Sequence, residues 1–340
     1  MKKLAPATLI GFFAFTVVLF NLFVVPFSKA ETTLRYANFP PAPTFPCVQM
    51  ERWAKEVEKR TNGEVKVETF PGGTLLGASN MYEGVASGIA DIGLSCPAYM
   101  PGRFPLMAGI DQPVGFKSCE VSSHVFWKLV KEFEPKSISN FKLITVFTSA
   151  PSYIATIKPV RNLEDLHGLQ LRAAGNMVAT LDALGAAPIG MPMSELPEAL
   201  QKGVVKGYAA SLEVLMDFKF AEIVKYVADY SLGTVSFAVL MNKAKWDSLS
   251  PSVQKVINDL SEEQAVWTGQ YMDNHVEKAV KWAKAEEGLQ ILDLSGEEKS
   301  RWAKRLQPVI DKYVDDTEEK GLPGKRFLDR LYELKAKYEK

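Results

Sequence analysis

Short stretches that alternate between apolar and polar residues are separated along this chain by longer stretches of helical periodicity. Residues 33–38 and 64–69 alternate in this way, which predicts two strands. Between them, from Cys47 to Arg60, apolar residues recur at roughly helical spacing, and an Asn-Gly pair follows that ends the predicted helix. The prolines between Phe39 and Phe45 predict an irregular loop, because proline disfavours a helix there. The pattern predicts a β-α-β unit with a loop at which a ligand can meet the backbone.

One such unit occurs twice, once in each half of the chain. A helix predicted over about 79–87 ends at Gly88 and leads directly into a strand, and the segment Glu83–Ile92 has a counterpart in Glu198–Gly207. In each copy a glycine follows the helix, Gly88 or Gly203, where its freedom to adopt a positive φ lets a strand begin almost at once. The repetition predicts two similar lobes.

Strands that alternate with helices of this length predict an α/β fold with mostly parallel sheets and helices on both faces. Open parallel sheets bind ligands at the carboxyl ends of their strands, so the cleft between the two lobes is the expected site. Apolar residues step by three or four from Val253 to Trp282, which predicts a helix of about thirty residues, long enough to brace both lobes. Further helices are predicted from Gly296 to about Lys312 and from Arg326 to Lys340.

Residues 1–30 have the features of a signal peptide. Lysines follow the first residue, residues 4–25 are almost wholly apolar, and Ser28 to Ala30 places small residues where a signal peptidase cuts. We expect cleavage before Glu31 and export to the periplasm. The alternative is an uncleaved membrane anchor, because the apolar stretch is long enough to span a bilayer. The absence of a basic cluster directly after it favours cleavage.

Length and charge limit the classes of protein to consider. The 340 residues include 40 basic and 40 acidic ones, so no excess positive charge is available to hold nucleic acid or an anionic membrane surface. The length suggests two domains after the signal peptide. We expect lobe I in residues 31–151 plus about 234–275, and lobe II with the C-terminal helices in 152–233 plus about 276–340.

The sequence contains no P-loop and no G-x-G-x-x-G, G-x-S-x-G or H-E-x-x-H motif, and its three histidines lie far apart. An enzyme is therefore unsupported, and we expect no cofactor and no metal. Cys47, Cys96 and Cys119 have no zinc or redox spacing. An oxidising compartment permits one disulfide and one remaining thiol, but three buried thiols are an equal alternative, and the sequence leaves the pairing open.

Six segments together point to one family. They are Thr-Asn-Gly-Glu-Val-Lys-Val at 61–67, Gly-Thr-Leu-Leu-Gly at 73–77, Gly-Ile-Ala-Asp-Ile at 88–92, Asn-Leu-Glu-Asp-Leu-His-Gly-Leu-Gln-Leu-Arg at 162–172, Ala-Leu-Gly-Ala-Ala-Pro at 183–188 and Glu-Ala-Leu-Gln-Lys-Gly-Val-Val at 198–205. In this order they resemble the solute receptors of tripartite ATP-independent periplasmic (TRAP) transporters, of the DctP type. The resemblance covers nearly the whole chain after the signal peptide. It implies a periplasmic-binding-protein-like fold and a transport function.

In that family the arginine that ends the L-x-G-L-x-L-R segment pairs with the carboxylate of the ligand, and the matching residue is Arg172. A guanidinium suits this role because its planar fork of donors meets a carboxylate in two parallel bonds. The alternative is a structural arginine bonded to a nearby acid such as Asp165. The small residues Ala-Ala-Gly that follow favour the first role, because they let a ligand approach closely.

Two polar positions of the family differ in this chain. Ser152 stands where members that bind dicarboxylates or sialic-acid-like ligands tend to have a second arginine, and a polar Gln-Glu-Asn run is replaced at 208–210. One arginine among several aromatic residues suits a monocarboxylate with an apolar or aromatic body. Lys158, Lys206 and Arg103 are near in sequence, so the number of cations in the site stays open. The predicted ligand-binding residues are Phe39, Tyr99, Ser152, Tyr153, Arg172, Asn176, Tyr208, Ser211 and Glu213.

We expect a monomer whose cleft closes around the ligand. Docking of the loaded form on TRAP membrane subunits is implied by the resemblance alone. A receptor for an ABC importer or for a sensor is the alternative among binding proteins, and neighbouring genes for one large and one small membrane subunit would exclude it. A periplasmic enzyme on the same fold is the alternative from another class. Turnover with Glu83, Glu195 or Glu213 as the base would favour that alternative.

Overall fold

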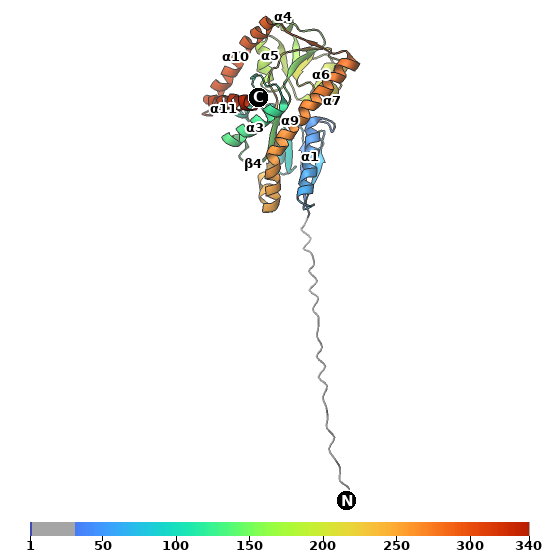
Figure 1. Cartoon of the computed structure of the whole chain (residues 1–340), viewed down its shortest axis with the longest axis vertical. Coiled ribbons are helices and arrows are strands. Elements are labelled where there is room, and N and C mark those ends of the chain that lie inside the picture. Colours follow the sequence, from blue (N-terminus) through green and yellow to red (C-terminus); the bar gives the residue numbers. More distant parts are fainter. Residues whose placement is uncertain (2–30, 340) are drawn as a thin grey trace. The chain divides into compact units, whose positions relative to one another are not determined.

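The computed structural model describes Met1 and residues 31–339, and it shows an α/β fold built on two sheets (Figure 1). Apart from Met1, the predicted signal peptide lies outside the described residues. The five-stranded sheet of lobe I has the order β2 (Val65–Phe70), β1 (Thr32–Asn38), β3 (Ile92–Ser95), β10 (Ser236–Asn242), β4 (Phe141–Thr148). The six-stranded sheet of lobe II has the order β11 (Gln290–Leu292), β9 (Tyr226–Ala228), β5 (Tyr153–Thr156), β8 (Gly207–Ala210), β6 (Gln170–Ala173), β7 (Ala187–Gly190).

Helices flank both sheets, as the alternation of strands and helices predicts. Those associated with lobe I are α1 (Phe45–Arg60), α2 (Met81–Ala86), α3 (Cys119–Phe133), α8 (Lys243–Asp247) and α11 (Gly324–Tyr338). Those associated with lobe II are α4 (Leu163–Leu166), α5 (Met177–Ala183), α6 (Leu196–Gln201), α7 (Val214–Asp217) and the start of α10 (Gly296–Glu318). The helix α9 (Pro251–Glu287) contacts both lobes.

Both sheets are mixed, although we expected mostly parallel ones. β1 pairs in parallel with β2 and β3, β6 with β7 and β8, and β9 with β11. β10 is antiparallel to β3 and β4, and β5 is antiparallel to β8 and β9. These antiparallel strands are the ones next to the two points where the chain crosses between lobes. A strand that arrives from the other lobe enters the sheet from the cleft edge, so it runs against the strands that β-α-β crossovers place in parallel.

The long helix α9 confirms the helix predicted from the apolar stripe. It has 37 residues, it begins where the side chain of Ser250 accepts a hydrogen bond from the Val253 amide, and it ends at Gly288 with φ of 67°. Its apolar face changes partners along its length: Ile257 is buried in the lobe I core, whereas Ala283 is buried in a lobe II core. In Figure 1 it runs as one orange rod from beside α1 to α7. A single helix therefore braces both lobes.

The segment 276–340, which we grouped with lobe II, is divided between the lobes. Trp302 of α10 is fully buried in a lobe II core. Phe327 and Leu331 of α11 are fully buried in the lobe I core, and the Tyr313 hydroxyl donates a hydrogen bond to a carbonyl of that lobe. α11 ends on lobe I because its apolar stripe packs against α3. The boundaries of the lobes along the chain stay a prediction.

Two crossing segments lie side by side where the lobes meet, and we call them the hinge: residues 149–152 and 232–235. Their backbones are joined by hydrogen bonds, among them Ser149 N to Val235 O at 2.8 Å and Ser152 N to Gly233 O at 2.8 Å. Asp111 is buried against the hinge, and its Oδ2 accepts a hydrogen bond of 2.9 Å from the Ser236 hydroxyl. Burial raises the pKa of Asp111 to about 8. Its protonated form is thus the one that the folded hinge favours.

We expect Asp111→Asn to flatten the dependence of stability on pH. The pKa of Asp111 in the folded protein lies above its unfolded value of about 3.9. The contribution of Asp111 to stability is therefore fully present below about pH 4 and is lost as the pH rises through about 8. The free energy of unfolding falls by up to about 1.4 kcal/mol per pH unit over this range. The asparagine keeps the neutral form at every pH. The measurement is the free energy of unfolding of both proteins by denaturant from pH 5 to 9. The exposed substitution Asp329→Asn serves as the control, and equal slopes for Asp111→Asn and the unaltered protein would contradict the prediction.

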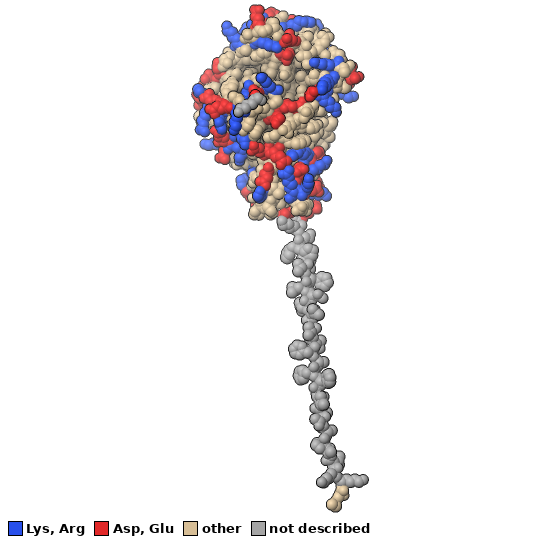
Figure 2. Space-filling view, in the orientation of Figure 1, with Lys and Arg blue, Asp and Glu red and all other residues tan. Residues whose placement is uncertain are grey.

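Basic and acidic side chains intermingle over the face seen in Figure 2. This matches the equal numbers of the two kinds in the sequence. No helix among residues 31–339 is both long enough and apolar enough to cross a bilayer. The three cysteines, Cys47, Cys96 and Cys119, are free and buried, so the structure favours buried thiols over a disulfide.

Candidate functional site

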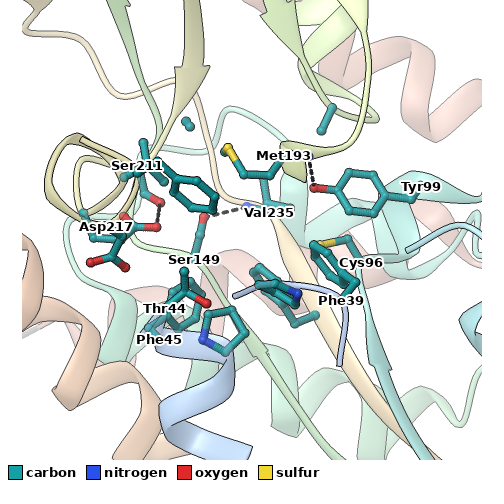
Figure 3. Close-up of a pocket in the computed structure, with 18 of the residues that line it drawn as sticks. Phe39, Thr44, Phe45, Cys96, Tyr99, Ser149, Met193, Ser211, Asp217 and Val235 are labelled. Atoms are coloured by element: carbon teal, nitrogen blue, oxygen red, sulfur yellow. Dashed lines mark hydrogen bonds between the residues drawn. The ribbon is translucent and has the colours of Figure 1, made fainter. Parts of the chain in front are cut away.

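A pocket lies between the lobes, at the carboxyl ends of β1, β3, β6 and β8 (Figure 3). This is the edge at which open α/β sheets bind ligands. Lobe I and the hinge supply Phe39, Pro40, Thr44, Phe45, Pro46, Cys96, Tyr99, Ser149, Val235 and Phe237. Lobe II supplies Arg172, Ala174, Met193, Ala210, Ser211, Glu213, Val214, Asp217 and Phe218. The lining is mainly apolar with a few polar side chains, which is typical of a site for a small organic molecule.

Arg172 is the cationic residue of this lining. It lies in β6, between β7 and β8, and its side chain is 2% exposed. Its Nε donates a hydrogen bond of 3.0 Å to the Met191 carbonyl, which fixes the plane of the guanidinium. Within residues 31–339 no carboxylate forms an ion pair with it. The guanidinium therefore has donors left for an anion in the pocket.

Tyr99 brings lobe I into contact with this arginine. Its hydroxyl oxygen accepts a hydrogen bond of 3.1 Å from the Met193 amide and a longer one of 3.4 Å from Arg172 Nη2. Both bonds use the oxygen as the acceptor, so the hydroxyl proton of Tyr99 is left to be donated. Phe39 packs edge-on against the Tyr99 ring at 5.5 Å. Arg172 and Tyr99 together form a donor-rich end of the pocket, which we call the cationic end.

The opposite end of the pocket is acidic. Glu213 is 3% exposed, and its Oε1 accepts a hydrogen bond of 2.8 Å from the Ser211 hydroxyl (Figure 3). Asp217 Oδ1 lies 2.7 Å from Nε2 of His275 on α9. Burial, and after it the charge of Asp217, raises the pKa of Glu213 to about 7, and the bond to Asp217 raises the pKa of His275. We call the residues Ser211, Glu213 and Asp217 the acidic end.

Aromatic side chains form the walls between the two ends. Phe45 packs edge-on against Phe237 at 5.3 Å, and Phe237 stacks on Phe147 behind it at 5.2 Å. Phe218, at the acidic end, stacks on Phe220 at 5.3 Å. Rings held in this way present flat apolar faces with little freedom to move. The arrangement can bind a flat apolar body with a carboxylate at one end.

Five of the predicted ligand-binding residues line the pocket: Phe39, Tyr99, Arg172, Ser211 and Glu213. The other four, Ser152, Tyr153, Asn176 and Tyr208, are not part of its lining. Each of the four has a structural place elsewhere in the described fold.

Tyr208 precedes Ala210 by two positions in β8, further from the carboxyl end of the strand, and its ring packs on Phe220 at 5.2 Å. Ser152 belongs to the hinge through its backbone. Tyr153 packs against a lobe II core, and Asn176 lines a neighbouring groove beside Asp182. These four residues are close in sequence to strand ends near the pocket, but their side chains are not part of its lining.

Several lining residues were missed by sequence reasoning. Thr44 and Phe45 directly follow the proline loop, and the predicted loop was a signal for them. Ser149, Phe237 and Asp217 had no comparable signal, because they come from the hinge, from a strand that returns to lobe I and from a helix of four residues. Their place depends on contacts between distant segments.

Comparison with known proteins places this geometry in a family. Residues 40–316 match the model of the family described as bacterial extracellular solute-binding protein, family 7 (DctP). The C4-dicarboxylate-binding periplasmic protein DctP of Rhodobacter capsulatus is 27% identical over 266 residues, which cover 76% of this chain and 79% of that protein.

Solved structures agree. A TRAP periplasmic solute-binding protein of Desulfovibrio salexigens, an open complex with the C-terminus of a symmetry mate in its ligand-binding site, is 49% identical, with a TM-score of 0.83 over 91% of this chain and 97% of that one. A marine metagenome TRAP solute-binding protein specific for aromatic acid ligands, solved with 3-hydroxybenzoate, is 30% identical, with a TM-score of 0.87 over 91% of this chain and 99% of that one. This chain belongs to the bacterial extracellular solute-binding proteins of family 7 and has the two-lobed fold of TRAP solute receptors.

Proposed function

We propose that this chain binds a small organic monocarboxylate with an aromatic or apolar body in the pocket between its lobes. One observation carries the proposal: Arg172 is almost fully buried, yet no carboxylate within residues 31–339 pairs with it. A buried guanidinium without an anion is costly, and the carboxylate of a ligand supplies the missing partner. Tyr99 adds a hydroxyl donor beside it.

The charges of the pocket favour one carboxylate over two. Its lining contains one cationic side chain, the arginine already described, whereas Lys158, Lys206 and Arg103 lie outside it. In their ionised forms, Glu213 and Asp217 at the acidic end would repel the second carboxylate of a short dicarboxylate. The desolvation of that second group would then have no compensation.

The walls favour an aromatic body. Phe45, Phe218 and Phe237 line the space between the two ends, and ring contacts add about 0.5–1.5 kcal/mol each beyond the burial of area. The marine relative that is specific for aromatic acids supports the same ligand class. Family membership supports delivery of the bound ligand to TRAP membrane subunits in the periplasm, with closure of the lobes as the step that excludes water.

Competition between succinate and an aromatic acid tests the proposal. On the purified protein, we expect indole-3-acetate or phenylacetate to bind at least about tenfold more tightly than succinate in isothermal calorimetry, because succinate has an unpaired second charge. Indole-3-acetamide, which lacks the carboxylate, is the control and should bind far more weakly than the acid. Tighter binding of succinate would overturn the proposal.

A further inference from the structure

Two carboxylate oxygens at the acidic end lack a partner. Glu213 is 3% exposed and Asp217 has a side chain that is 5% exposed. One oxygen of each is held, by Ser211 and His275 respectively. Among the described residues, Glu213 Oε2 and Asp217 Oδ2 are buried and have no hydrogen-bond partner. Buried acceptors are almost always satisfied, so these two need an explanation.

The acidic end is held firmly by the elements around it. Ser211 to Asp217 follow β8 and include the short helix α7, which packs against α9. On α9, His275 holds Asp217 and stacks on Tyr271 at 5.6 Å. Because these side chains are fixed by packing, the free oxygens cannot turn to find partners elsewhere. Both residues line the pocket, so a bound molecule is the group that can reach them.

We propose that Glu213, supported by Asp217, is a second polar subsite that binds a hydroxyl group of the ligand at the end remote from its carboxylate. The inference rests on the proposed function and specifies it further: the preferred ligand is a ring-hydroxylated aromatic acid. The hydroxyl would donate its proton to Glu213 Oε2, satisfying the buried acceptor. Discrimination by this kind of contact is strong, because a ligand without the hydroxyl leaves the acceptor buried and unpaired.

The cationic end and the acidic end lie on opposite sides of the pocket. Figure 3 shows Tyr99 and Cys96 on one side of the pocket and Ser211 and Asp217 on the other. Tyr99 contacts Arg172 on the first side, whereas Ser211 holds Glu213 on the second. The hydroxyl and the carboxylate must therefore be separated by a body such as an aromatic ring. An α-hydroxy acid, whose two groups are adjacent, does not meet this requirement.

A hydroxyl suits Glu213 better than a cation does. Burial favours the neutral form of this acid and raises its pKa to about 7. A hydroxyl can donate to the ionised form and can accept from the protonated form, so it is compatible with both. An ammonium group would need Glu213 to be ionised.

The test is a two-by-two comparison by isothermal calorimetry at pH 7. The ligands are phenylacetate and its 3- and 4-hydroxy derivatives, and the proteins are the full chain and Glu213→Met, which keeps the volume and removes the acceptor. We expect at least one hydroxyl derivative to bind the unaltered protein at least about tenfold more tightly than phenylacetate. In Glu213→Met this preference should disappear, because methionine offers the hydroxyl no carboxylate acceptor. Glu222→Met, at an exposed position of lobe II outside the pocket lining, is the matched control and should keep the preference.

Three outcomes would overturn the subsite. Phenylacetate could bind the unaltered protein as tightly as both hydroxyl derivatives do. This comparison needs only the unaltered protein, so it is decisive even if Glu213→Met does not fold. The preference could survive in Glu213→Met, which would place the hydroxyl elsewhere. Tighter binding of 4-(aminomethyl)benzoate than of 4-hydroxybenzoate would assign the subsite to cations. Failure of the proposed function is distinct from all three, because then phenylacetate itself would not bind.

Discussion

Replacing Arg172 with alanine is expected to weaken the binding of an aromatic carboxylate at least about a hundredfold. The substitution removes the cation of the pocket lining and leaves the carboxylate of the ligand buried without a cationic partner. Truncation of one member of a buried charge pair costs about 2–5 kcal/mol or more, which is about 30-fold to several thousand-fold in affinity. Isothermal calorimetry with phenylacetate measures the effect.

The fold should survive this substitution, because Arg172 forms no ion pair among the described residues. In the absence of ligand we expect the melting temperature of Arg172→Ala to be unchanged or higher, since a buried unpaired charge is removed. Arg172→Lys should recover little, because an ammonium lacks the planar fork. Arg161→Ala, an exposed arginine of the same lobe, is the control and should bind normally. Unaltered affinity in Arg172→Ala would remove this residue from the site.

Gly175→Ala is expected to lower the affinity for ligand about tenfold by hindering closure of the lobes. Gly175 follows β6 on lobe II, and a Cβ at this position would lie 2.5 Å from the Cβ of Ala98 on lobe I and 3.0 Å from its Cα. The neighbour is a short side chain next to its own backbone, so it cannot swing away. Overpacking of this kind costs about 1–3 kcal/mol in the closed form, which is about 5- to 150-fold in affinity.

Gly168→Ala is the matched control for the strain of a positive φ. Gly175 has φ of 52° and Gly168 has φ of 68°, but a Cβ on Gly168 would meet nothing within 4 Å. Both alanines should cost about 1–2 kcal/mol of stability, whereas Gly175→Ala alone should lose affinity. X-ray scattering should show that saturating ligand makes the unaltered protein and Gly168→Ala more compact, and Gly175→Ala less so. Equal affinity in the two variants would contradict a closing contact at Gly175.

The two ends of the pocket depend on the closed arrangement to different extents. The hydrogen bond between Ser211 and Glu213 at the acidic end lies within lobe II, so it does not require a contact with lobe I. The cationic end is completed by Tyr99 of lobe I, whose hydroxyl reaches the Met193 amide and Arg172 across the pocket. A ligand that is first held on lobe II would therefore gain contacts as lobe I closes. It would bind the closed form more tightly than the open form, and this difference in affinity is what favours closure.

The features that the sequence determined by itself are local or belong to the family pattern. The apolar stripe from Val253 to Trp282 is enough to specify α9, because a period of three to four residues can be buried along one side of a helix. The family segments placed Arg172 at the end of a strand, where the structure shows it in the pocket. The proline loop after Phe39 likewise predicted a part of the lining.

The acidic end and the aromatic walls were decided by the tertiary structure. Asp217 and His275 are 58 residues apart, and the packing of α7 on α9 brings them together. Phe45 meets Phe237 because β10 returns to the lobe I sheet after the chain has built lobe II. The same return makes the sheets mixed. Local periodicity predicts which residues are buried. Which side chains point into a shared cavity depends on the neighbouring strand and on the direction in which that strand enters the sheet. Contacts between distant segments set both the neighbour and the direction.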